Sequence, residues 1–333
     1  MILNNINFEM DNYNDYKVPN RLLILGNGFD LNLGRRTRYS DFANSEFWPK
    51  DLKSDLFGYL NNKKGIEKWF DLEGELANYV SLVKKRYAGA YMRTIHDMAK
   101  EDEQDFKVIV EKMMDYLSFT EKETSPDVKS MAFYVFSLVC NDKAFQKVYS
   151  FNYTDLYKLS NILCLEHNLK FEYVHGCLAD KSAILGVNDS VDTIDGNYDF
   201  LRKSFNSHYA SHPISYDLQN VDEVVFFGHS LGDNDYHYFQ SFFRQQCKEN
   251  MERKDGRDIT IFTYNEKSRM EIMHTLHKMN EGQTSLLFQN NNLRIFCTED
   301  EEKNESEAFK SWCENLREER VRFDTMDFFD GIQ

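Results

Sequence analysis

The sequence predicts an α/β protein with a doubly wound, mostly parallel sheet and a large helical insertion after the first strand. Seven short apolar runs have the length of buried strands, and helical patterns follow several of them. The apolar residues of these runs are consecutive, which is typical of parallel strands covered on both faces. Between residues 36 and 141 no such run occurs, and apolar residues recur at helical spacing.

The expected strands are residues 21–25, 147–151, 171–174, 183–187, 221–227, 258–262 and 293–297. The expected helices of the sheet domain are residues 155–168, 235–250, 266–280 and 302–319, with a further helix or loop insertion at 195–212. In the helical insertion, one apolar face is predicted from Trp69, Leu72, Leu76, Tyr79, Val80 and Val83. The domain organisation follows as a polar leader (1–20), a Rossmann-like nucleotide-binding domain (21–35 and 142–320), an inserted helical subdomain (36–141) and a tail (321–333).

Composition narrows the function classes. The chain has 40 basic and 55 acidic side chains, a net charge of −15, which argues against general nucleic-acid binding. Hydrophobic residues make up 41% of the 333 residues, enough for a large core. No window has the roughly 20 apolar residues of a membrane helix, so a cytoplasmic protein without a membrane partner is expected. Six scattered cysteines without C-x-x-C spacing predict reduced thiols and no metal site.

Four polar segments follow predicted strands, where doubly wound sheets bind their ligands. The first contains Gly26, Asn27, Gly28, Phe29 and Asp30, with Gly34 and Tyr39 further along. Glycine at a strand exit lets backbone N–H groups approach a phosphate. The spacing differs from the dinucleotide fingerprint G-x-G-x-x-G, and the alternative is a turn in which Asp30 caps a helix.

The second and third segments supply candidate catalytic residues. Asn152 follows the second strand and could orient a ribose or a carboxamide, while His175, before Gly176, could act as a base near neutral pH. Simpler alternatives are a helix cap for Asn152 and a turn residue for His175.

The fourth segment, residues 227–235, contains Gly228, His229, Ser230 and Asp235. Its G-x-S-x-G pattern is that of a hydrolase nucleophile elbow with Ser230 as nucleophile. In those enzymes the histidine normally follows the last strand, whereas the last histidine here, His277, precedes it. A serine hydrolase is therefore the less favoured alternative, and His274 with His277 is expected to be a surface pair and not a metal site.

Together these blocks resemble the bacteriophage abortive-infection AbiH family. The resemblance rests on ILGNGFDLNLG, WFDLE at 69–73, SFNYTD, VHG and FFGHSLGDND, which follow one another in that family's order. More remotely, the blocks are similar to sirtuin-like NAD-consuming defence proteins. Thr154 stands where those have an acidic residue, and the four-cysteine zinc module of sirtuin deacylases is missing, so deacylation is not expected.

The resemblance implies an anti-phage protein that binds NAD, or a related nucleotide, and hydrolyses its N-glycosidic bond. It implies Asn152 at the nicotinamide ribose and His175 as catalytic base. Glu73 is a further candidate because it lies four residues after Trp69, at the edge of the predicted apolar stripe, and its alternative role is an ion pair or cap. The residues expected to contact the nucleotide are Gly26, Asn27, Gly28, Phe29, Asp30, Gly34, Tyr39, Asn152, Gly176, Gly228, His229, Ser230 and Asp235. A non-catalytic nucleotide sensor is the main alternative, and a phage-derived trigger or partner protein and a homo-oligomer are further expectations.

Overall fold

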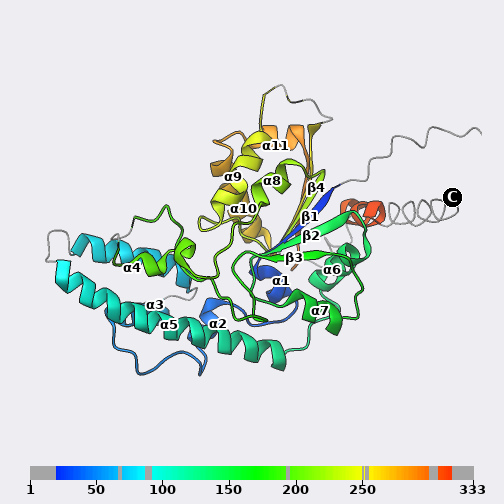
Figure 1. The fold of residues 1–333 in the computed structure, drawn as a ribbon. Helices are drawn as coiled ribbons and strands as arrows, with labels where there is room; N and C mark the ends of the chain where they lie inside the picture. Colours follow the sequence, from blue (N-terminus) through cyan, green and yellow to red (C-terminus); the bar gives the residue numbers. More distant parts are fainter. Residues whose placement is uncertain are drawn as a thin grey trace, which may run out of the picture.

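A six-stranded parallel sheet and an arm of helices make up the structure (Figure 1). The computed structural model describes residues 20–66, 70–86, 92–192, 196–249, 251, 255–299 and 307–316. The strand order is β3-β2-β1-β4-β5-β6, and every neighbouring pair is parallel. The predicted doubly wound fold is confirmed, with the reversal of strand order between β1 and β4.

Six of the seven predicted runs form the sheet. The strands are β1 (Arg21–Leu25), β2 (Phe145–Ser150), β3 (Lys170–Tyr173), β4 (Glu223–Phe227), β5 (Asp258–Thr263) and β6 (Asn292–Cys297). The prediction of a strand at 183–187 is wrong. This segment forms a loop in which Ile184 donates to His175 O, Val187 donates to Leu201 O, and only one isolated bridge is made. Gly186, at φ +155°, breaks the extended run.

Helices cover both faces of the sheet, and the central strands β1 and β4 are buried at every position. One face is covered by α1 (Asn27–Asn32), α6 (Met131–Asn141), α7 (Leu156–Ile162) and the helical residues 307–316. The other is covered by α8 (Ile214–Gln219), α9 (Tyr236–Gln245), α10 (Glu266–Met279) and α11 (Thr284–Asn290). Along β1, Leu23 and Leu25 face the first group, and Leu22 and Ile24 face the second.

The predicted helices 155–168, 235–250 and 266–280 are present with shorter bounds, and residues 307–316 of the predicted helix 302–319 are helical, its two ends lying outside the described residues. The predicted helix 155–168 ends at Ile162, and Cys164 follows with a φ of +55°. The predicted helix 235–250 ends at Gln245, and α11 was not predicted. Between β3 and α8 the chain forms two short 3₁₀ helices, η2 (Asp199–Leu201) and η3 (Lys203–Phe205).

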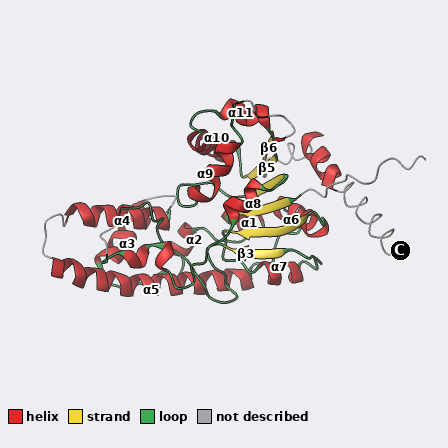
Figure 2. Cartoon of the chain, turned by 45° about the horizontal axis from the view of Figure 1, so that its top comes forward, coloured by secondary structure: helices red, strands yellow, loops and turns green. Residues whose placement is uncertain are grey.

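The arm projects from one side of the sheet (Figure 2). It comprises α2 (Tyr39–Ala43), α3 (Asp55–Ile66), α4 (Leu72–Arg86) and α5 (Met92–Glu123) and has its own core. On α4 all five described residues of the predicted apolar face are buried: Leu72, Leu76, Tyr79, Val80 and Val83. Trp69 lies outside the described residues. Of the predicted 36–141 insertion, α6 packs on the sheet with α1 and not in the arm.

Asp102 of α5 ties the arm to the loop that follows β3. Its buried carboxylate accepts hydrogen bonds from the hydroxyls of Tyr79 (2.6 Å) and Tyr198 (2.7 Å) and from the backbone of Leu56 (2.9 Å). Burial raises the pKa of Asp102. Tyr198 directly precedes η2, so the loop carrying η2 and η3 is anchored in the arm.

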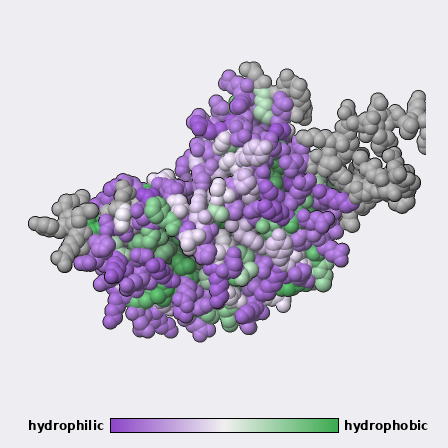
Figure 3. Space-filling model, in the orientation of Figure 1, coloured by the Kyte–Doolittle hydropathy of each residue, from purple (hydrophilic) through white to green (hydrophobic). Residues whose placement is uncertain are grey.

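The visible surface is mainly hydrophilic, with hydrophobic side chains gathered over the arm (Figure 3). Among the described helices, none combines the length and the apolar character needed to cross a bilayer.

Candidate functional site

The exits of β1 and β4 are packed directly against each other. Gly28 N donates to Gly228 O (2.9 Å), and Gly26 N donates to Phe227 O (3.0 Å). A Cβ on Gly28 would lie 2.6 Å from Gly228 Cα, and one on Gly228, whose φ is +64°, would lie 2.4 Å from the backbone of Gly28. These glycines are thus required by backbone contact between two loops, and protein fills the point at which the strand order reverses.

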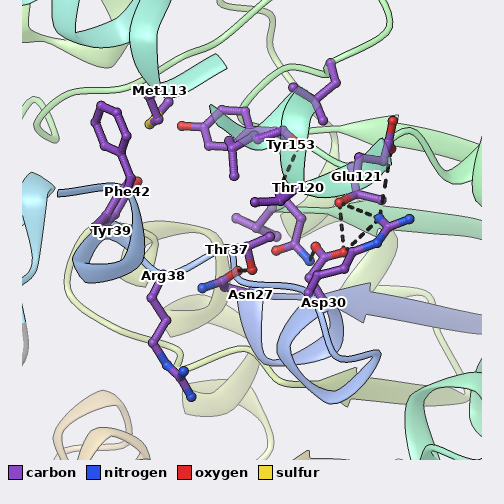
Figure 4. Close-up of a pocket in the computed structure, with 16 residues that line it drawn as sticks. Asn27, Asp30, Thr37, Arg38, Tyr39, Phe42, Met113, Thr120, Glu121 and Tyr153 are labelled. Atoms are coloured by element: carbon purple, nitrogen blue, oxygen red, sulfur yellow. Dashed lines mark hydrogen bonds and ion pairs between the residues drawn. The ribbon is translucent and has the colours of Figure 1, made fainter. Parts of the chain in front are cut away.

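A cavity of about 650 Å³, part of it open to solvent, lies beside the exits of β1 and β2. Its walls come from α1, α2, α5 and the loop after β2, so it lies between the sheet and the arm. Figure 4 shows a polar end with Asp30 and Glu121 and an apolar end with Phe42 and Met113. An apolar cavity with a few convergent polar groups is the usual form of a small-molecule site.

Asp30 is the centre of the polar end. It is buried, and its carboxylate accepts hydrogen bonds from Asn152 (2.7 Å), Thr154 (2.8 Å) and Arg35 (3.3 Å). Burial raises the pKa of Asp30, although Arg35 and the hydrogen bonds oppose that effect. The side chain of Asp30 is therefore held rigidly at the cavity wall.

Three buried polar atoms at this end, Asn152 Oδ1, Arg35 Nε and Glu121 Oε1, have no hydrogen-bond partner among the described residues. The amide nitrogen of Asn152 donates to Gly26 O (2.9 Å) and to Asp30, but its Oδ1 has no donor. Arg35 Nε likewise has no acceptor. Asn152 does not cap α7, because Asp155 does so by accepting from Lys158 N. Unpaired buried polar groups are rare, so a ligand that supplies donors to Asn152 and Glu121 and an acceptor to Arg35 fits this end.

His175 lies at the exit of β3 and is buried. Its Nε2 is 3.0 Å from Asp235 Oδ1 and 3.2 Å from Lys203 Nζ, while its Nδ1 has no partner among the described residues. Its ring packs edge-on against Phe151, which also lines the cavity. The structure therefore brings together His175 and Asp235, two predicted site residues from different strand exits.

Lys203 and Glu73 complete this group, which we call the His175 cluster (Glu73, His175, Lys203, Asn234 and Asp235). Lys203 Nζ lies 3.0 and 3.1 Å from the two oxygens of Glu73, and Asn234 donates to Glu73 at 3.0 Å. Burial alone would lower the pKa of Lys203, but the carboxylates of Glu73 and Asp235 outweigh it and raise this pKa. Although burial favours the neutral acid, His175 and Lys203 hold the pKa of Asp235 well below its usual range.

His229 approaches Asp235 from the other side. Its Nδ1 accepts a hydrogen bond from Leu231 N (2.9 Å), and its Nε2 lies 3.6 Å from Asp235 Oδ2. Burial lowers the pKa of His229 to about 4, so the ring is neutral near pH 7. With Nδ1 as an acceptor, the proton is on Nε2 and points towards Asp235.

Ser230 does not form a nucleophile elbow here. It is exposed, its Oγ accepts a hydrogen bond from Gly232 N (3.3 Å), and within the described ranges no histidine is hydrogen-bonded to it. The positive φ of the turn falls on Leu231 and not on the serine.

The cavity and the His175 cluster adjoin at Phe151, whose ring lines the cavity and packs edge-on against His175. Tyr39 and Tyr153 both line the cavity. Burial raises the pKa of each, and the charge of Glu73 raises both further. The two parts therefore form one site at the exit edge of β1, β2 and β3.

The predicted site residues divide among these places. Asn27, Asp30, Tyr39 and Asn152 line the cavity, with Asn27 accepting from Thr37 at its wall, whereas Phe29 packs in the core against Phe136 and Phe227. Gly176, at φ +86°, allows the turn after His175, since a Cβ there would strike Ser182 O. Gly34 has open space around it.

Lys203 and Arg35 were not predicted. Lys203 lies in a loop without periodicity or motif, and only the position of Arg35 beside the first segment could have suggested it. The described residues contain no group of three or more His, Cys, Asp or Glu side chains placed to hold a metal ion.

Comparison with protein families matches residues 22–253 to the family described as Bacteriophage abortive infection AbiH. The chain belongs to the AbiH family. The match covers more than half of the chain and includes the arm, the cavity and the whole His175 cluster. Membership assigns this AbiH protein to anti-phage abortive infection. Comparisons with curated proteins and with solved structures found no significant match.

Proposed function

We propose that this AbiH protein binds NAD or a related nucleotide in the cavity and hydrolyses its N-glycosidic bond. One observation carries the proposal: a cavity with an unpaired Asn152 Oδ1 adjoins a partly buried His175–Asp235 pair at the exit edge of a doubly wound sheet. That edge is where such sheets bind nucleotides.

The reaction breaks the bond between ribose C1′ and the nicotinamide nitrogen, and the bonding electron pair leaves with the nicotinamide. Positive charge develops on the ribose, and a water oxygen then bonds to C1′ and loses a proton. The products are nicotinamide, ADP-ribose and a proton. Oriented polar groups and a positioned base lower the barrier of such a step.

The residues of the site divide these tasks. Asn152 Oδ1 accepts a hydrogen bond from a ribose hydroxyl, and Asp30 holds the Asn152 amide in place. Asp235 accepts a hydrogen bond from Nε2–H of His175, which leaves the lone pair on Nδ1 as the base that takes the proton of water. A buried carboxylate in this position fixes the ring and stabilises the imidazolium that forms.

An NAD-consuming enzyme that was always active would kill its host, so the proposal includes control by a phage-derived trigger or partner protein and by self-association. The non-catalytic sensor is supported by a different observation. The polar atoms of the His175 cluster pair largely with one another, as in a purely structural network.

The test is to incubate the purified chain with NAD, alone and with lysate from phage-infected cells, and to separate nicotinamide and ADP-ribose by chromatography. His175→Ala and Asn152→Ala should each lower turnover about 100-fold or more. His274→Ala and Asn161→Ala, at exposed positions on α10 and α7, are matched controls and should retain activity. Binding without turnover would favour the sensor, and an absence of both would refute the proposal.

A further inference from the structure

Two partners of opposite character converge on one ring nitrogen of His175. Asp235 Oδ1, a hydrogen-bond acceptor, lies 3.0 Å from Nε2, and Lys203 Nζ, a donor, lies 3.2 Å from the same atom. In a neutral imidazole, Nε2 has either a proton or a lone pair in the ring plane. It can therefore serve only one of the two partners at a time.

Each choice gives Nδ1, on the other side of the ring, a different function. When Nε2 carries the proton and donates to Asp235, Nδ1 has a free lone pair and can accept a proton. When Nε2 accepts from Lys203, the proton is on Nδ1, and the ring cannot act as a base there. Asp235 and Lys203 thus favour opposite tautomers.

Glu73 competes with His175 for Lys203. Both oxygens of the Glu73 carboxylate lie within 3.1 Å of Lys203 Nζ, and all three side chains are at least nine-tenths buried. A charge-assisted hydrogen bond to a carboxylate is about twice as strong as a neutral one. The Glu73 carboxylate is therefore the stronger partner of the ammonium, which still lies 3.2 Å from His175 Nε2 with Glu73 in place.

We infer that Lys203 is a positioning residue that selects the tautomer of His175, and that Glu73 restrains it. With Glu73 in place, Lys203 binds the carboxylate, Nε2–H donates to Asp235, and Nδ1 is the base. Without Glu73, Lys203 donates to Nε2, and the base is lost.

This arrangement gives the arm control over the chemistry. Glu73 belongs to α4 in the arm, whereas His175 and Asp235 follow β3 and β4 of the sheet. The loop that carries Lys203 is held to the arm through Tyr198 and Asp102. A trigger that displaced α4 from this loop would therefore change the tautomer of His175 without touching the cavity.

The experiment reads the tautomer directly. The full chain is labelled with ¹⁵N on histidine, and long-range ¹H–¹⁵N spectra are recorded above the pH range in which histidine titrates, with His175 identified from its missing signals in His175→Ala. The wild type should carry the proton on Nε2, and Glu73→Gln should carry it on Nδ1. The double variant Glu73→Gln/Lys203→Met should return it to Nε2.

The double variant is the matched control, since it removes both members of the Glu73–Lys203 ion pair, while Asp235, which loses its 3.8 Å contact with Lys203, keeps its 3.0 Å contact with His175 Nε2. Lys203→Met alone would leave Glu73 buried and unpaired. If the proton stays on the same nitrogen in wild type and Glu73→Gln, the inference is overturned.

The link between the tautomer and activity rests on the proposed function, whereas the spectra test the tautomer independently of it. NAD turnover should fall about 100-fold in Glu73→Gln and recover to within about tenfold of wild type in the double variant. A tautomer change without turnover in any variant would support the inference and count against NAD hydrolysis. A loss of turnover without a tautomer change would overturn the inference and support NAD hydrolysis.

Discussion

The two ends of the central strands both bury charged side chains, but they use them differently. At the start of β1 and β4, Arg21 lies 2.7 Å from both Asp142 and Glu223, and Trp312 donates to Glu223 at 2.8 Å. Each oxygen of these two carboxylates has a donor, since Ala144 N serves the remaining one. At the exits of β1, β2 and β3, by contrast, a cavity is present and the buried Asn152 Oδ1 has no donor.

The difference separates stability from function along the same strands. Among the described residues, the network at the start edge contains no histidine and leaves no carboxylate oxygen unpaired, so it contributes to holding the sheet together. The exit edge places a histidine between an acid and a lysine and keeps polar atoms available for a ligand. Unpaired or strained groups are a free-energy cost that sites retain for function.

The sharpest test of this separation is Arg21→Met. It leaves Asp142 and Glu223 buried without their cation, and such a change costs about 3–5 kcal/mol of unfolding free energy. Urea unfolding should show this loss, while NAD turnover per folded molecule stays at the wild-type value. A large loss of turnover in the folded variant would contradict the separation.

Lys107→Met is the control for Arg21→Met. It removes an exposed pair with Glu103 on α5 and should change the unfolding free energy by no more than about 0.5 kcal/mol.

Gly228→Ala tests the closed contact between the β1 and β4 exits. The new Cβ would meet the backbone of Gly28 and Phe29 at 2.4 Å and would require a positive φ, so a loss of about 3 kcal/mol is expected in urea unfolding. Gly58→Ala, in α3 with open space around it, should instead raise stability by up to about 1 kcal/mol. Unchanged stability in Gly228→Ala would show that the two loops can separate.

A third prediction concerns pH, to which only the exit edge contributes a buried histidine. The pKa of His229 falls to about 4 in the folded protein, whereas an unfolded chain has about 6.5. Above pH 6.5 both states are neutral. As the pH falls from about 6.5 to 4, the unfolded chain gains a proton that the folded one does not, so stability decreases by up to about 3 kcal/mol.

Urea unfolding across this pH range should show the decrease, and His229→Asn should reduce it. Asparagine can still accept from Leu231 N through its side-chain oxygen but does not titrate. An equal slope in wild type and His229→Asn would contradict the assignment.

Much of the fold was predictable because burial of a strand on both faces produces a recognisable local sequence pattern. Consecutive apolar residues identified β1 to β6, and the helical spacing of Leu72 to Val83 identified α4. The same rule failed at 183–187, which is apolar because Ala183, Leu185 and Val187 pack on the core of the arm. A buried loop segment and a buried strand therefore have the same apolar pattern in the sequence.

The site was predictable only at strand exits, where topology guarantees proximity. That argument singled out Asn152, His175 and Asp235, but it could not pair His175 with Asp235 across 60 residues. Nor could it place Lys203, because nothing local shows that a loop folds back on two distant carboxylates. Gly28 and Gly228 were expected to let the backbone approach a ligand, but in the structure they allow contact between two loops.

The hydrogen bond from Tyr198 to Asp102 also limits which truncations of this protein can retain its structure. Because the loop after β3 rests on α5, the arm cannot be excised as a dispensable domain. A version reduced to the sheet would lose Glu73 and the support for Lys203, together with one wall of the cavity. The smallest working unit therefore comprises the arm and the sheet, and libraries of truncations should keep both.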